Sequence, residues 1–183
     1  MQKIDSELVY ESLEGDDNAF KELLQRHLKH TYNFIYQLSG SEEEAKDITQ
    51  DTFVKVWKNL KKYNDKSSFK TWVINIARNT TIDYLRKRRL ILFSNLQKDD
   101  DENFEETLID IEPLQDELFE IEENKNKVEK LLLEISIEKR TILILHINEN
   151  LTFEEISKIL NKPLNTIKSQ YRRSLLELKE SLS

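Results

Sequence analysis

The sequence predicts an all-α protein made of two small helical domains that are joined by a flexible acidic linker. Only 2 glycines and 2 prolines occur in 183 residues, and Leu, Ile, Glu and Lys are abundant, which favours helices over strands. Apolar residues recur at three- and four-residue spacing, as in helices that bury one face. Residues 1–90 and 127–183 each carry a net charge of +2, whereas residues 91–126 carry −11. This distribution indicates an acidic linker between two modestly basic domains.

Residues 1–90 divide into four predicted helices. Glycine ends the first two helices, and Ser41 with Glu44 has the spacing of a capping box that begins the third. Asp17 is expected to cap the second helix, and Phe53 and Trp57 are expected in the core below the third. In chain order, the helices are predicted over residues 6–14, 17–40, 41–60 and 69–89.

The segment from Lys66 to Arg89 combines positive charge with aromatic side chains. It holds seven basic residues and one acidic residue, interleaved with Phe69, Trp72 and Tyr84. Cations attract phosphate, and aromatic rings hold bases that have left the stack, so this mixture suits single-stranded or opening DNA. In the alternative reading, the aromatic residues belong to the core and the terminal cations only favour a helix C-terminus.

The last third of the chain has the pattern of a helix-turn-helix. Thr152 and Glu155 form a predicted capping box, and Asn161 and Pro163 end the first helix and lead into the second. The second helix is expected to bury Ile167, Leu175 and Leu178. Its remaining polar and basic side chains are of the types that contact base edges and phosphates in DNA.

Three motifs in order resemble bacterial RNA polymerase sigma factors of the extracytoplasmic-function (ECF) type. They are the segment from Asp47 to Trp57, the segment from Phe69 to Arg86, and the helix-turn-helix. The resemblance implies that residues 1–90 are similar to sigma region 2 and residues 127–183 to sigma region 4. It also implies promoter DNA, core RNA polymerase and an anti-sigma factor as partners, and a role without catalysis or a cofactor.

The resemblance implies three sets of site residues. The core polymerase-binding face would consist of Asp47, Gln50, Asp51, Val54, Lys55 and Lys58. The surface that opens and reads the minus-ten element, with one base flipped into a loop pocket, would consist of Ser67, Ser68, Phe69, Lys70, Trp72, Arg78, Asn79, Asp83 and Arg86. The minus-thirty-five element would be read by Thr166, Lys168, Ser169, Tyr171, Arg172 and Arg173. Promoter preference is not implied, because Gln170 and Tyr171 depart from the usual pattern of the family.

Two other functions fit parts of the sequence. A one-component regulator would bind a ligand or dimerise through residues 1–90 and bind DNA through the helix-turn-helix. An all-helical nucleotide pyrophosphatase would hold Mg²⁺ on Glu43, Glu44, Asp47 and Asp51, although such chemistry needs further carboxylates from a facing helix. A sigma factor explains the basic run from Arg86 to Arg89, which the regulator leaves without a role.

Cysteine and histidine usage narrows the class of protein further. The chain has no cysteine, which excludes disulfides and thiolate metal sites. We expect His27, His30 and His146 to be structural rather than metal ligands. No apolar run approaches the roughly 18 residues of a membrane span, and the first residues lack a signal-peptide core, so a soluble cytoplasmic protein is expected.

Overall fold

The computed structural model describes residues 3–96 and 130–181, and these residues form helices without a strand. The prediction of an all-α fold is confirmed. The elements are α1 (Asp5–Leu13), α2 (Asp17–Ser39), α3 (Glu42–Asn59), the short 3-10 helix η1 (Leu60–Lys62), α4 (Phe69–Leu96), α6 (Ile137–Ile147), α7 (Phe153–Leu160) and α8 (Leu164–Ser181). Most of the predicted acidic linker, residues 97–126, lies outside the described residues.

The N-terminal module, residues 3–96, contains the four predicted helices with small changes at their ends. Asp16 rather than Asp17 caps α2, because its carboxylate accepts a hydrogen bond from the Asn18 amide at 2.9 Å. Gly40 ends α2 in the left-handed conformation, with a φ of 76°. The prediction that the fourth helix ends near Arg89 is wrong, since α4 continues to Leu96. Residues 91–96, which were predicted to begin the linker, are therefore helical.

The C-terminal module, residues 130–181, contains the predicted helix-turn-helix in α7 and α8. The Thr152 hydroxyl accepts a hydrogen bond from the Glu155 amide at 3.2 Å, and the Glu155 carboxylate accepts one from the Thr152 amide at 2.8 Å. Both halves of the predicted capping box are thus formed. Asn161 ends α7 with a φ of 49°, as the turn requires.

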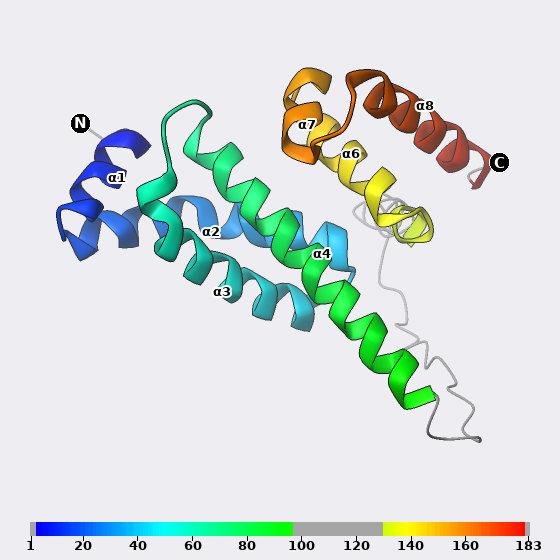
Figure 1. Ribbon diagram of the computed structural model, residues 1–183, viewed down its shortest axis with the longest axis horizontal. Helices are drawn as coiled ribbons and strands as arrows, with labels where there is room; N and C mark the ends of the chain where they lie inside the picture. Colours follow the sequence, from blue (N-terminus) through cyan, green and yellow to red (C-terminus); the bar gives the residue numbers. More distant parts are fainter. Residues whose placement is uncertain (1–2, 97–129, 182–183) are drawn as a thin grey trace, which may run out of the picture.

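One hydrophobic core is shared by the two modules, which the sequence did not predict. Phe34 and Leu38 of α2 and Ile74 of α4 belong to the same buried cluster as Ile142 and Leu145 of α6. These five side chains are all at least 98% buried. In Figure 1, α6 lies alongside the α2 and α4 layer, with α7 and α8 on its outer side. The modules are therefore packed together rather than held apart.

A second buried cluster joins α1 to the other end of the N-terminal module. It includes Leu8 of α1, Leu23 of α2, Val56 of α3 and Phe69 at the start of α4. Because Phe69 begins α4 within this cluster, the loop that precedes α4 is anchored at its end. No helix among the described residues is long and apolar enough to span a membrane.

Candidate protein and nucleic-acid interfaces

The outer face of α3 carries the whole predicted polymerase set. All six residues are exposed on this one helix, namely Asp47, Gln50, Asp51, Val54, Lys55 and Lys58. Buried residues on the opposite side of α3, including Ile48 and Val56, hold the helix against α2 and α4. The Lys55 ammonium differs from the other five, because it donates a hydrogen bond to the Thr80 hydroxyl of α4 at 3.1 Å. The face is thus a rigid surface with both charged and apolar side chains.

An apolar groove runs between α2 and α3 beside this face. Its volume is about 410 Å³, and it is lined by Phe20, Leu24, Leu28, Thr49, Gln50, Phe53, Val54 and Trp57. The expectation that Phe53 is buried is confirmed, but the same expectation for Trp57 is wrong, since 46% of its surface is exposed. The indole packs edge-on against Phe20, with ring centroids 4.6 Å apart, and so forms one wall of the groove. The α2 contribution was missed because its apolar stripe was assigned wholly to the core.

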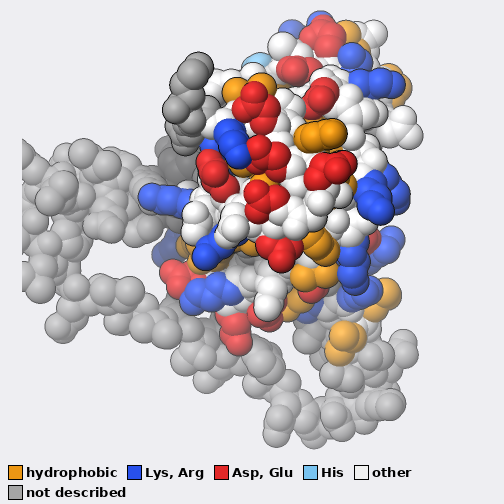
Figure 2. Space-filling model, turned by 90° about the vertical axis from the view of Figure 1, so that its left-hand side faces the viewer, with side chains coloured by type: hydrophobic (Ala, Val, Ile, Leu, Met, Phe, Trp, Pro, Cys, Tyr) orange, Lys and Arg blue, Asp and Glu red, His pale blue; other side chains and the backbone are white. Residues whose placement is uncertain are grey.

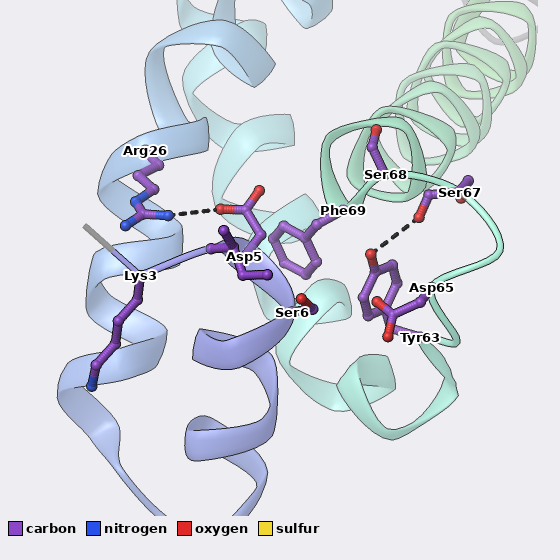
Figure 3. Close-up of a pocket in the computed structure, with 10 residues that line it drawn as sticks. Lys3, Asp5, Ser6, Arg26, Tyr63, Asp65, Ser67, Ser68 and Phe69 are labelled. Atoms are coloured by element: carbon purple, nitrogen blue, oxygen red, sulfur yellow. Dashed lines mark hydrogen bonds and ion pairs between the residues drawn. The ribbon is translucent and has the colours of Figure 1, made fainter. Parts of the chain in front are cut away.

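The loop before α4 forms a second cavity with the start of α1. This cavity has a volume of about 590 Å³ and is lined by Lys3, Ile4, Asp5, Ser6, Arg26, Tyr63, Asp65, Ser67, Ser68 and Phe69. Figure 3 shows Tyr63 and the loop on one side and Asp5 with Arg26 on the other. The sequence pointed to Ser67 and Ser68, but nothing in it indicated that α1 supplies the opposite wall.

Hydrogen bonds and burial fix both walls of this cavity. The Tyr63 hydroxyl donates to the Ser67 carbonyl at 3.0 Å, and burial with the nearby Asp65 carboxylate raises the pKa of Tyr63 to about 12. Tyr63 therefore remains a donor at neutral pH. Across the cavity, the Asp5 carboxylate accepts from the Arg26 guanidinium at 3.0 Å and lies 2.8 Å from the His27 ring. The loop and α1 are thus held in fixed positions.

The predicted aromatic residues of the minus-ten set lie within the protein or partly so. Phe69 is 2% exposed and packs against Tyr63, Trp72 and His27, with ring centroids between 5.3 and 5.7 Å apart. Trp72 is half-buried beside Tyr63. Phe69 therefore forms part of the cavity wall and is itself almost fully buried. The exposed side chains available to a ligand are those of the loop.

The polar members of the minus-ten set are divided between two sides of α4. Asn79, Asp83 and Arg86 are exposed along one side, and the Arg86 guanidinium pairs with Asp83 at 3.1 Å. Lys70 and Arg78 are partly buried, and Lys70 pairs with Glu149 of the C-terminal module. Burial lowers the pKa of Arg78, although the nearby Glu138 carboxylate partly opposes that shift, and the guanidinium remains charged. The structure thus exposes three of these residues together and partly covers the other two.

The helix-turn-helix presents most of its predicted residues to solvent. Lys168, Ser169, Arg172 and Arg173 of α8 are exposed, and Thr166 is half-buried. The Tyr171 ring instead packs against Phe153 and His146, with centroids 5.1 and 4.9 Å away. Of the three side chains expected to be buried in this helix, Ile167 is buried and Leu178 is partly buried. The expectation for Leu175 is wrong, since it is 41% exposed.

The other candidate sites do not come together as metal centres. Within residues 3–96 and 130–181, no group of three or more acidic, histidine or cysteine side chains is arranged to hold a metal ion. Glu44 is buried and its carboxylate pairs with Arg88 at 2.7 Å, whereas Asp47 and Asp51 are exposed. The three histidines contact Asp5, Glu149 and the Leu151 carbonyl.

The α1 end of the molecule is unsuited to phosphate. Viewed from this end, the surface has acidic side chains gathered across its centre, with basic side chains on both sides of them (Figure 2). Helix α1 alone carries Asp5, Glu7 and Glu11. Since like charges repel, a nucleic-acid backbone would avoid the acidic centre of this face.

Comparison with known proteins matches this division into modules. Residues 23–91 match the sigma-70 region 2 family, and residues 125–178 match the sigma-70 region 4 family. The chain is similar to the ECF RNA polymerase sigma factor SigW of Bacillus subtilis, with 27% identity over 171 residues, 92% of this chain and 91% of that protein. It is also similar to the RNA polymerase sigma-H factor of Pseudomonas aeruginosa, with 29% identity over 176 residues, 94% of this chain and 91% of that protein.

A solved structure with the same architecture is the sigma factor RpoE of Bartonella quintana in complex with the anti-sigma factor NepR. It superposes with a TM-score of 0.69 and 26% sequence identity, over 89% of this chain and 96% of that chain. A region 2 module followed by a region 4 module defines a sigma-type initiation factor of RNA polymerase. The similarity to ECF sigma factors extends over nine-tenths of the chain, and the chain belongs to the RNA polymerase sigma factors of the ECF type.

A sigma factor binds core RNA polymerase and directs promoter recognition, DNA melting and transcription initiation. The alternative of a one-component regulator is not favoured, because the region 2 match covers the residues to which that hypothesis gave a ligand-binding or dimerisation role. The same match leaves no support for a nucleotide pyrophosphatase.

Proposed function

We propose that this sigma factor divides its work among three surfaces. The α3 face with its adjoining groove binds core polymerase, the loop cavity and α4 open and read the minus-ten element, and α8 reads the minus-thirty-five element. The observation that carries this assignment is the separation of an apolar groove from basic surfaces on the same rigid scaffold. Protein interfaces need desolvated apolar anchors, whereas DNA contacts need cations and polar donors.

The groove is suited to a helical partner. Trp57 and Val54 are each 46% exposed and line the same groove, so they provide neighbouring apolar anchors that gain free energy on burial. Gln50 and Asp51 lie beside them on α3 and can orient the partner through hydrogen bonds. We expect this combination to contact the largest subunit of core polymerase.

The loop cavity is suited to a base that has left the DNA stack. Capture in a pocket offsets an unstacking cost of about a few kcal/mol. The rigid Tyr63–Ser67 contact and the Asp5–Arg26 pair keep the cavity formed before DNA arrives, so less ordering is needed on binding. Ser67 lines it with a hydroxyl group that can both donate and accept a hydrogen bond. The Ser68 hydroxyl instead accepts from the Thr71 amide at 3.1 Å and lies 2.8 Å from the Thr71 hydroxyl, so it fixes the beginning of α4.

The region 4 module is suited to the major groove of duplex DNA. Exposed Arg172 and Arg173 lie on α8, the second helix of the motif, which is the helix that enters the groove in helix-turn-helix proteins. Since the Tyr171 ring is packed against Phe153, we expect it to position α8 rather than to read bases through its ring.

The remaining expectations concern the setting of the protein. We propose that it acts in the cytoplasm with core polymerase and performs no bond chemistry of its own. The RpoE relative was solved with an anti-sigma factor, and an inhibitor of that kind is a reasonable partner for this chain.

In vitro transcription tests the proposal as a whole. Purified full-length protein is added to core polymerase with a library of genomic fragments, and transcript starts are mapped. We expect initiation at a small set of sites that share two elements and depend on the protein. Initiation that is unchanged by the protein at every fragment would contradict the proposal.

A further inference from the structure

The turn after α6 places one buried carboxylate against the N-terminal module. The Glu149 side chain is 4% exposed, and its carboxylate lies 2.7 Å from the His30 Nε2 of α2 and 3.1 Å from the Lys70 ammonium of α4. The Glu149 amide donates to the Ile144 carbonyl at 3.1 Å, and Asn150 adopts a left-handed φ of 55°. The turn thus fixes the backbone that carries this carboxylate at the contact between the modules.

A second acidic residue of the C-terminal module faces the same surface. The Glu138 carboxylate of α6 accepts from Lys162 at 2.7 Å, and its charge also acts on Arg78 of α4. Lys70 is thus paired with an acid of the other module, and Arg78 lies within the electrostatic influence of a second one. Carboxylates and phosphates are both charged acceptors for such cations, so Glu149 competes with a DNA phosphate for Lys70.

The rest of the contact explains why the two modules stay together. The buried Arg140 donates to the Leu38 carbonyl at the end of α2 at 2.7 Å, and Asn148 donates to the Gln37 amide oxygen at 2.8 Å. Apolar side chains of α6 pack against α2 and α4 around these bonds. In the closed arrangement, removing one partner of such a contact leaves a buried charge or polar group unpaired, which is strongly unfavourable. Substitutions at Glu149 or Arg140 are therefore expected to disturb this contact.

We infer that Glu149 is an autoinhibitory latch: by pairing with Lys70 and His30 it closes the C-terminal module over the minus-ten surface of the free protein. The inference rests on the proposed function, because it treats Lys70 as a DNA ligand. Opening exposes Lys70 and Arg78 together and frees α8 to reach a separate DNA element. The affinity of the free protein for DNA is reduced by the fraction that is closed.

The latch is tested in full-length protein by measuring the distance between the modules. The chain has no cysteine, so Glu14→Cys in the N-terminal module and Glu180→Cys in α8 give a unique pair of spin labels at exposed sites. We expect one narrow distance distribution in this otherwise unaltered protein and a broader, longer one after Glu149→Lys, which places three basic groups together. Glu154→Lys, an exposed residue of the same module, is the matched control and should leave the distribution unchanged.

A charge exchange separates a latch from a folding defect. The double variant Glu149→Lys with Lys70→Glu restores opposite charges and should return the narrow distribution. An unchanged distribution in Glu149→Lys would overturn the inference. So would a failure of the exchange to restore closure, since that outcome would show loss of structure rather than loss of a pair.

DNA binding is measured separately with a fluorescent pool of random single-stranded 20-mers. For Glu149→Gln we expect an affinity at least about fivefold higher than that of the unaltered protein, as the competent fraction rises. Adding Lys70→Ala should remove most of this gain. If Glu149→Gln opens the protein without raising DNA affinity, the latch stands and the assignment of this surface to DNA fails. If the protein stays closed, the latch itself fails.

Discussion

The α3 face and the α4 face of the N-terminal module differ in what covers them. On α3, the six candidate polymerase residues are exposed and an apolar groove lies open beside them. On α4, the candidate promoter residue Lys70 pairs with Glu149 of the C-terminal module, and Arg78 is partly buried under the charge of Glu138. The free protein therefore offers its polymerase surface and keeps part of its DNA surface covered. Binding to polymerase can precede opening, which would restrict promoter recognition to the assembled enzyme.

The largest effect on stability is expected from the hydrophobic core that joins the two modules. Phe34 is 1% exposed and belongs to the cluster shared by both modules. Phe34→Ala should lower the free energy of unfolding by about 3–5 kcal/mol, because it removes contacts and leaves a cavity. Leu28→Ala, at a side chain that is 41% exposed, should cost less than about 1 kcal/mol.

Urea denaturation followed by circular dichroism measures both variants of this core. If the modules share one core, Phe34→Ala shifts a single transition. Two separate transitions, of which Phe34→Ala shifts only the one at lower urea concentration, would show that the modules unfold independently. The α4 face would then not be held under the C-terminal module by a shared core.

Promoter reading should be affected next. Arg172→Ala removes an exposed cation of α8 and should weaken transcription from the cognate promoter by about 5- to 150-fold, equivalent to about 1–3 kcal/mol. Its affinity for core polymerase should remain close to that of the unaltered protein. Run-off transcription and a pull-down with core polymerase measure the two quantities. Equal loss in both assays would count against separate surfaces.

The reverse pattern is expected for the groove. The double variant Gln50→Ala with Val54→Ala should weaken core polymerase binding about tenfold, or about 1.4 kcal/mol, since it truncates two exposed groove residues. Lys62 of η1 is exposed and lies outside the groove, so Lys62→Ala serves as the control. Titration of labelled protein with core polymerase gives the affinity. An unchanged affinity for the double variant would place the polymerase site elsewhere.

The fold of the helix-turn-helix was predictable because its signals are local. Thr152 and Glu155 cap α7, and Asn161 allows the left-handed turn, so neighbouring residues determine the structure. The exposure of the α3 set followed from helical periodicity for the same reason. The Glu149–Lys70 contact could not be predicted, because it joins residues 79 positions apart and periodicity does not say which helices meet. The exposure of Trp57 was mispredicted likewise, since exposure at a helix edge depends on the neighbouring helix.

A smaller effect is expected at the cap of α7. Thr152→Ala should cost about 1 kcal/mol, because the Glu155 amide loses its acceptor. The hydrogen bonds from Thr152 also lower the pKa of Glu155 below 4.5. The ionised carboxylate therefore contributes stability above pH 4.5 that is lost as the pH falls through its folded pKa. Thermal melts between pH 3 and 7 should show a smaller difference between variant and unaltered protein at the acid end.

The smallest effect is expected at the loop cavity. Tyr63→Phe removes the hydrogen bond to Ser67 and should cost about 0.5 kcal/mol, because the loop is largely exposed. Folding raises the Tyr63 pKa from 10 to about 12, so its contribution to stability is intact below pH 10 and is lost as the pH rises toward 12. Melts between pH 9 and 12 should show this loss in the unaltered protein and not in Tyr63→Phe. Parallel curves would contradict the role given to Tyr63.

The contrast between an open polymerase face and a covered promoter face is tested most directly by adding core polymerase to the doubly labelled protein without DNA. The distance between labels at positions 14 and 180 is measured before and after addition. We predict a short, narrow distribution for the free protein that becomes longer once the polymerase is bound. A distribution that stays short in a complex that then initiates transcription would contradict the account.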